Sequence, residues 1–146
     1  MTDTIAEMLA NRRLERVARN ADQAETMITT AEKHLRTARM IAEIEDHAMA
    51  FTAAYDGARK SLAAVLALEG LRIRPVGGAH RNTGVAASAF VEDGSLRDFD
   101  WMRQIRNATE YPDDTRPEAT RQDVEEAISA AEAIIAACAR YVLARR

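Results

Sequence analysis

Apolar residues recur every three to four positions along most of this chain, which is the spacing of one face of an α-helix. The clearest stripe predicts a helix from Asn20 to about Ile44, in which Asn20 and Gln23 have the spacing of a capping box. A second long helix is expected after Asp46, which can cap it, and Gly70 can end it as the residue just past the C-cap. The first stripe consists of Ala24, Met27, Ile28, Ala31, Leu35, Ala38 and Ile41.

Two further capping boxes, Ser95 with Asp98 and Thr120 with Asp123, mark the starts of later helices. No stretch alternates as a strand does, so the pattern predicts an all-α, antiparallel bundle of about five to six helices. We expect one domain over residues 1–146, to which residues 1–20 are peripheral. The remaining helices are predicted over 4–17, 85–91 and 96–111 and from 120 onward, joined by a glycine-rich loop at 71–84 and a polar turn at 112–117.

Composition agrees with a helical bundle. The chain has 30 alanines and only 5% aromatic residues, whereas strands favour β-branched and aromatic side chains. The net charge of −3 provides no overall attraction for nucleic acid. Any contact with nucleic acid must therefore come from a local basic patch or from a surface shared by two copies of the chain.

The sequence offers little sign of a metal, a cofactor or a membrane. The only cysteine, Cys138, lies in an apolar run, where we expect a buried core residue rather than a nucleophile. A lone cysteine also fits a reducing, cytoplasmic compartment. We expect no signal peptide and no membrane-spanning segment. No group of residues has metal-ligand spacing, and Gly77-Gly78 lacks the surroundings of a phosphate loop, so no cofactor is predicted.

Residues 103–112 carry the most distinctive chemistry. In a helix ending at Pro112, five polar side chains share one face, namely Arg103, Arg106, Asn107, Glu110 and Tyr111. Two guanidinium groups beside an amide suit a phosphate or another anion, because the planar fork binds such groups bidentately.

The ordered motifs of the chain resemble those of a bacterial HEPN-domain protein. They are Tyr55-Asp56-Gly57-Ala58-Arg59-Lys60-Ser61-Leu62, Glu69-Gly70-Leu71-Arg72, Gly77-Gly78-Ala79-His80 and Arg103-Gln104-Ile105-Arg106-Asn107-Ala108-Thr109-Glu110-Tyr111-Pro112. The resemblance covers roughly residues 12–142. It implies a helical bundle that forms a homodimer. It also implies a ribonuclease toxin of toxin–antitoxin or phage-defence loci, often beside a nucleotidyltransferase antitoxin.

The resemblance also implies a catalytic signature from which this chain departs. The family pattern places a histidine five positions after an arginine, and Arg106 and Asn107 match, but Tyr111 occupies the histidine position. Metal-independent RNA cleavage needs a base for the 2′-hydroxyl proton, and a phenol with an ordinary pKa near ~10 is a poor base. We expect Arg106 to hold phosphate, Tyr111 to orient it, and turnover to be slow or absent.

Other side chains have two interpretations each. His80, in the glycine-rich loop, is either a replacement base or an exposed histidine. Beside these alternatives, we expect Arg81 and Arg103 to be auxiliary phosphate ligands. Asp56 either pairs with Lys60 or is buried opposite Arg103 or Arg106. Glu110, four residues after Arg106, can lock that arginine in a structural network. Gly57 within a helix suggests a close approach of two helices.

Two functional hypotheses follow. In the first, the protein is a toxin-like dimer that binds or cleaves RNA without metal, paired with a nucleotidyltransferase. In the second, it is a non-catalytic helical module whose dimer face binds a protein partner or a nucleotide. Neither involves a membrane.

Overall fold

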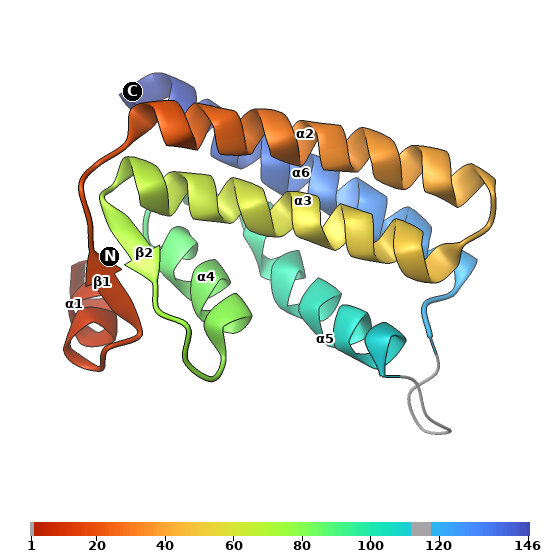
Figure 1. Cartoon of the computed structure of the whole chain (residues 1–146), viewed down its shortest axis with the longest axis horizontal. Helices are drawn as coiled ribbons and strands as arrows, with labels where there is room; N and C mark the ends of the chain where they lie inside the picture. The colour runs from red at the N-terminus through yellow and green to blue at the C-terminus, as the bar shows by residue number, and fades with distance from the viewer. Residues whose placement is uncertain (1, 112–117) are drawn as a thin grey trace.

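A long helical hairpin forms the frame of the protein. The computed structural model describes residues 2–111 and 118–146, and the hairpin consists of α2 (Ala21–Glu43) and α3 (His47–Leu68) (Figure 1). Both predicted N-caps are confirmed, because Asn20 accepts a hydrogen bond from the Gln23 amide and Asp46 accepts one from the Met49 amide. Gly70 lies just past the end of α3 with φ +72°, a conformation that glycine adopts without strain.

The expected close approach of helices at Gly57 is confirmed. A Cβ atom added there would lie 3.0 Å from the carbonyl oxygen of Ala31 on α2 and 3.4 Å from Ile135 of the last helix. Three helices therefore meet at this glycine, and only a residue without a side chain lets them do so.

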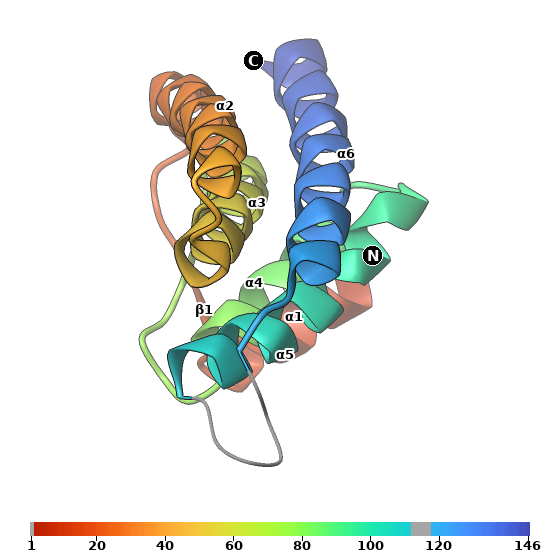
Figure 2. The ribbon, with the colours of Figure 1, turned by 90° about the vertical axis from the view of Figure 1, so that its right-hand side faces the viewer.

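The last helix, α6 (Arg121–Arg145), lies along α2 and α3 and completes the main core (Figures 1 and 2). The predicted capping box of Thr120 and Asp123 is present in full. Cys138 is buried, and burial raises the pKa of its thiol to about 12, so it is a core residue and not a nucleophile. By length and composition α6 could cross a membrane, contrary to our expectation, but its Ile134, Ile135 and Val142 are buried in the bundle, as in the core helix of a helical protein.

On the other side of α3 lie the shorter helices α4 (Ala79–Ser88) and α5 (Asp98–Glu110) (Figure 2). This arrangement corrects two predicted boundaries. The helix expected over 85–91 begins six residues earlier, at Ala79. Ser95 and Asp98 form no capping box, because Asp93 instead accepts hydrogen bonds from Ser95 and caps a 3₁₀ turn (Gly94–Arg97) that leads into α5.

A two-stranded ribbon replaces part of a predicted helix and part of a predicted loop. The helix expected over 4–17 ends early as α1 (Thr2–Ala10), and β1 (Leu14–Arg16) pairs in antiparallel register with β2 (Leu71–Ile73). Leu14 faces inward and packs with Ile5, Met8 and Leu71 in a small second core. The expected all-α bundle is nonetheless confirmed, with six α-helices in the described residues. The turn expected at 112–117 lies outside the described residues.

Candidate functional site

A buried tyrosine of α3 organises the polar residues between α3, α4 and α5. Tyr55 has no exposed surface, and its ring stacks on Phe99 with 5.2 Å between ring centroids. The guanidinium carbon of Arg106 lies 5.8 Å from the Tyr55 ring centre. Burial raises the pKa of the Tyr55 phenol to about 12, so this hydroxyl keeps its proton at physiological pH.

The Tyr55 hydroxyl lies 3.1 Å from Nδ1 of His80, near the start of α4. A buried phenol needs an acceptor for its proton, and this nitrogen is the acceptor that the described residues provide. We therefore assign the hydroxyl as donor and Nδ1 as acceptor, which leaves the histidine proton on Nε2. In this tautomer His80 presents a hydrogen-bond donor on its other side.

The charge state of His80 follows from its surroundings. Burial lowers its pKa from the ordinary 6.5, and Arg59 and Arg106 lower it further, while Asp56 acts in the opposite direction. His80 is therefore neutral near pH 7. A neutral imidazole can donate a hydrogen bond to a phosphate oxygen, or accept a proton if its tautomer changes.

A hollow of about 280 Å³ lies in front of His80, between the start of α4 and the face of α5. No side chain caps the N-terminus of α4, where Gly78 has φ +81°. The first backbone N–H groups of a helix lack partners within the helix and favour an anion. The hollow is lined by Gly78, Ala79, His80, Arg81, Arg103 and Asn107. Its chemistry suits a single phosphate group.

Both arginines of α5 already have carboxylate partners. Arg103 donates to Asp100 at 2.9 Å, and Arg106 lies 2.8 Å from Glu110, so the predicted pairing of Glu110 with Arg106 is confirmed. These partners are half exposed, with 53% of the Asp100 side chain and 43% of the Glu110 side chain accessible. An ion pair with an exposed partner is weak, so an incoming phosphate can compete with Asp100 for the guanidinium of Arg103, which lines the hollow.

Neither predicted partner of Asp56 is found. Asp56 lies 3.6 Å from Arg59 of its own helix, not beside Lys60, Arg103 or Arg106. Lys60 instead donates to Nε2 of His34 at 2.6 Å. Helix geometry allows either neighbour, since Arg59 and Lys60 follow Asp56 by three and four positions, and the contact of Lys60 with His34 leaves Arg59 beside Asp56. Asp56 thus lies beside Arg59 and acts on the charge state of His80, and it does not pair with an arginine of α5.

Tyr111 does not line the hollow. It is the C-cap of α5, its backbone leaves the helix with φ −128° and ψ 66°, and its side chain is 73% exposed. The expected single face of five residues therefore ends one residue early. Arg103 and Asn107 reach the hollow, Arg106 lies over Tyr55, and Glu110 and Tyr111 lie toward solvent.

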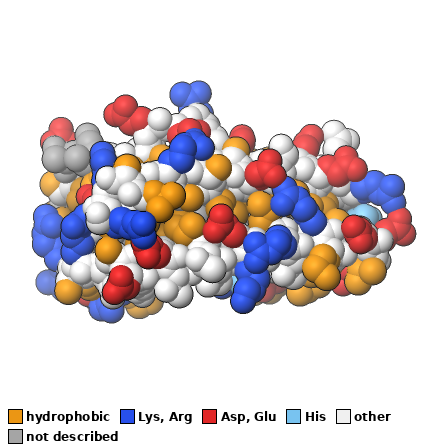
Figure 3. Space-filling view, turned by 90° about the horizontal axis from the view of Figure 1, so that it is seen from above, with side chains coloured by type: hydrophobic (Ala, Val, Ile, Leu, Met, Phe, Trp, Pro, Cys, Tyr) orange, Lys and Arg blue, Asp and Glu red, His pale blue; other side chains and the backbone are white. Residues whose placement is uncertain are grey.

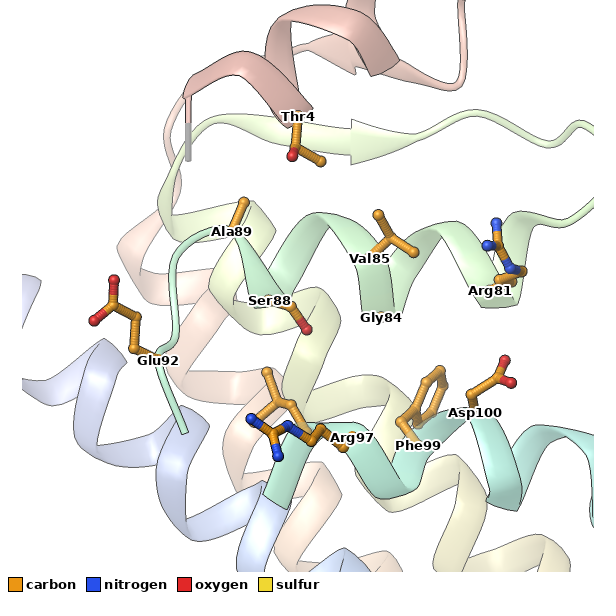
Figure 4. A pocket seen from close by; sticks show the side chains of 11 residues that line it. Thr4, Arg81, Gly84, Val85, Ser88, Ala89, Glu92, Arg97, Phe99 and Asp100 are labelled. Atoms are coloured by element: carbon orange, nitrogen blue, oxygen red, sulfur yellow. The ribbon is translucent and has the colours of Figure 1, made fainter. Parts of the chain in front are cut away.

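A larger cavity, of about 560 Å³, adjoins the hollow between α1, α4 and α5 (Figure 4). Arg81 of α4 and Asp100 of α5 flank one end of it, and the Phe99 ring lies between the two helices (Figure 4). The pKa of Asp100 is lowered mainly by its hydrogen bond from Arg103, with smaller contributions from Gln104 and Arg81. Asp100 thus pairs with Arg103 of its own helix and lies near Arg81 of α4.

Sequence reasoning missed Tyr55, Arg59 and Asp100 as parts of this cluster. A phenol and a guanidinium four residues apart on one face of the predicted helix were the available signal for the first two. Their contacts with α4 and α5 join residues far apart in the chain, and spacing alone does not reveal them.

Within residues 2–111 and 118–146, no group of three or more His, Cys, Asp or Glu side chains could hold a metal ion.

Charge on the opposite side of the bundle is mixed, with basic side chains gathered at the end where α2 begins and α6 ends, on the left of Figure 3. The cluster around His80 therefore differs from that surface in joining cationic groups to a hollow.

The chain matches the model of a known protein family. The model of the HEPN domain matches residues 24–141, from the first turn of α2 nearly to the end of α6. Neither a curated protein nor a solved structure matches the chain.

Proposed function

The chain belongs to the HEPN-domain family, and on that premise we propose that it binds RNA at the hollow between α4 and α5. One observation carries the proposal: His80, Arg103 and Asn107 line a hollow at a helix N-terminus that no side chain caps. A phosphate there receives hydrogen bonds from the guanidinium, the amide, the imidazole and the first-turn N–H groups of α4 that follow Ala79, whose own N–H donates to Val76. Arg106 supplies further positive charge from its place over Tyr55.

Cleavage by this site is slow or absent. With the His80 proton on Nε2, the imidazole meets a phosphate as a donor and not as a base. A 2′-hydroxyl attack needs a base, and general acid–base catalysis is worth typically ~10²–10⁴-fold. Tyr111, exposed at the end of α5, adds a phenol that can orient the strand but accepts a proton poorly.

Family membership supports a wider role. The protein acts as a homodimer in the cytoplasm and forms the toxin-like half of a toxin–antitoxin or phage-defence pair, with a nucleotidyltransferase as the second protein. Two copies of α5 facing one cleft would double the number of phosphate contacts, as an acidic chain requires for RNA binding. An adjacent nucleotidyltransferase gene would support this pairing.

Binding is tested by titrating a labelled single-stranded RNA and following its fluorescence anisotropy. Arg103→Ala and Arg106→Ala should each weaken binding strongly, because the first removes a guanidinium that lines the hollow and the second removes positive charge beside it. Both should flatten the salt dependence of the binding that remains, because counterion release scales with phosphate contacts. The matched control is Arg39→Ala, which removes a guanidinium that pairs with Glu132 on the α2–α6 side. If the α5 variants bind RNA as the wild type does, the cluster is structural.

Turnover is tested by incubating a mixed RNA pool with chelator and with wild type, Tyr111→His or His80→Ala. Slow wild-type cleavage that rises in Tyr111→His supports the proposal, because histidine has a suitable pKa at the family position. Fast wild-type cleavage that is lost in His80→Ala would instead identify His80 as the base. No cleavage by any folded variant, together with no RNA binding, would overturn the proposal.

One observation favours the second candidate function, a non-catalytic interaction module. Three large apolar side chains are exposed where α2 meets α3, with accessible fractions of 70% for Met40, 76% for Ile44 and 52% for Met49. Such a patch is typical of a protein-binding surface. Arg106→Ala and Ile44→Glu separate the candidates, because the first should affect RNA binding alone and the second partner binding alone.

A further inference from the structure

A second cavity lies on the far side of His80, at the ribbon. It has a volume of about 550 Å³ and is bounded by β2, the first turns of α2, the second half of α3 and the start of α4. We call it the ribbon pocket. Sites for small molecules are typically ~300–1,000 Å³.

One part of the ribbon pocket is apolar. Met27 of α2, Leu66 and Ala63 of α3, and Leu71 and Ile73 of β2 contribute to its wall. Leu66 and Leu71 also belong to the small second core, so this wall is held in place by packing. A compact apolar group would be removed from water there, at a gain of roughly 25 cal/mol per Å² of surface.

The other part is cationic. Arg59, Arg72 and Arg74 line the pocket, and none of its lining residues is a carboxylate. Arg72 is held by Glu15 at 2.6 Å, outside the lining. Arg74 makes no ion pair with any described residue.

Arg59 is only partly satisfied. Its distance to Asp56, 3.6 Å, exceeds that of a hydrogen bond, and its Nε is buried without a partner in the described chain. A buried donor without an acceptor is costly. Because this Nε has almost no accessible surface, an anion in the pocket would meet the terminal N–H groups of the guanidinium, whose contact with Asp56 is long. Arg59 and Arg74 thus provide charge at the pocket that the described residues leave available.

We propose that the ribbon pocket binds a small organic anion, in which a carboxylate or phosphate meets Arg59 and Arg74 and a compact apolar body meets Leu66 and Ile73. His80 lines both this pocket and the hollow, so an occupant would touch the residue that faces the proposed RNA phosphate. Binding of the anion to the ribbon pocket does not depend on the proposed RNA function. An effect of the anion on RNA binding does rest on that function.

Calorimetric titration tests the binding with three probes of similar size: 2-naphthoate, 1-naphthyl phosphate and the neutral 2-naphthalenemethanol. Either anion should bind more tightly than the alcohol, and the tighter of the two identifies the head group. Arg74→Gln should weaken anion binding by about tenfold or more through loss of one charge-assisted contact. Ala63→Phe should block all binding by filling the apolar wall.

Arg97→Gln is the matched control, since Arg97 lines the cavity of Figure 4 instead. Circular dichroism checks that each variant is folded, and Arg74→Gln keeps the test valid if Ala63→Phe does not fold. Equal binding of the alcohol, no binding of either anion, or loss of affinity in Arg97→Gln equal to that in Arg74→Gln would overturn the proposal.

A second readout is independent of RNA. Saturating anion should raise the pKa of His80, followed by NMR of its ring protons, because a nearby negative charge favours the imidazolium. An unchanged His80 titration with bound anion would place the anion elsewhere and overturn the proposal. If the anion binds and shifts His80 while RNA binding fails in every assay, the ribbon pocket stands and the proposed RNA function falls.

Discussion

At the scale of single residues, Tyr55 determines what His80 can do. The phenol is fixed by stacking on Phe99 and by the Arg106 guanidinium, and its hydroxyl meets Nδ1 of the histidine. The histidine is therefore oriented by a group that does not itself reach the hollow. Removing only the hydroxyl oxygen of Tyr55 would remove the contact that orients His80 and leave the packing of the ring in place.

Tyr55→Phe should lower the free energy of unfolding by about 0.5–1.5 kcal/mol, the net worth of one hydrogen bond, while the ring contacts remain. It should also raise the pKa of His80, because Nδ1 loses a donor that favours the neutral ring. Urea denaturation and NMR titration measure the two effects. An unchanged His80 pKa in a folded variant would contradict the assigned tautomer.

The pH dependence of stability has a definite sign at His80 and His34. Burial lowers the pKa of both rings, and Lys60 is the next cause at His34. The unfolded chain then takes up protons first as pH falls below 6.5, so stability is complete above that pH and decreases below it. Urea midpoints at pH 7.5 and 5.5 should show this loss, and His80→Gln should reduce it. A midpoint that rises on acidification would show the opposite linkage.

At the scale of elements, the meeting of α2, α3 and α6 at Gly57 limits what the hairpin tolerates. Gly57→Ala should destabilise the protein by about 1 kcal/mol or more, because overpacking typically costs ~1–3 kcal/mol and exceeds the better helix propensity of alanine. Gly77→Ala is the control, since an added Cβ there meets nothing within 4 Å. Thermal unfolding compares them, and equal melting temperatures would show that α2 and α3 shift apart easily.

Helix ends were predictable where their signals are local. Asn20, Asp46 and Thr120 each cap a helix through an amide three residues later, so sequence spacing reveals them. The ribbon was not predictable, because two three-residue strands have no alternation to detect and their pairing joins segments 57 residues apart, as in the Glu15–Arg72 contact.

The candidate site was predictable only in part for the same reason. Helical spacing placed Arg103 and Asn107 together on α5, and both reach the hollow. It could not show that Tyr111 leaves the helix as its C-cap, nor that Tyr55 meets His80 across two helices. Both features depend on the positions at which α4 and α5 pack against α3.

At the scale of the whole molecule, net charge and assembly together determine how tightly the protein can bind RNA. A chain of charge −3 with a small cationic hollow gains RNA affinity by joining two hollows in one cleft. We expect a two-fold homodimer at micromolar concentration, with the mass of two 16.1 kDa chains by light scattering. Ile44→Glu is a useful companion variant, since it tests whether the exposed patch at the α2–α3 turn contributes. A monomeric wild type at that concentration would contradict the expected assembly.

The ribbon also bears on how the chain folds as it is synthesised. Once α2 and α3 associate, Leu14–Arg16 and Leu71–Ile73 are already close, so their pairing closes the hairpin at little entropic cost. The nascent chain can therefore seal this unit before α4, α5 and α6 have emerged from the ribosome. Its α3 then presents Phe51, Leu62 and Val65 without the later helices that bury them. Until the ribosome releases α6, the apolar side of α3 is a surface that a chaperone can hold or that a second nascent chain can meet.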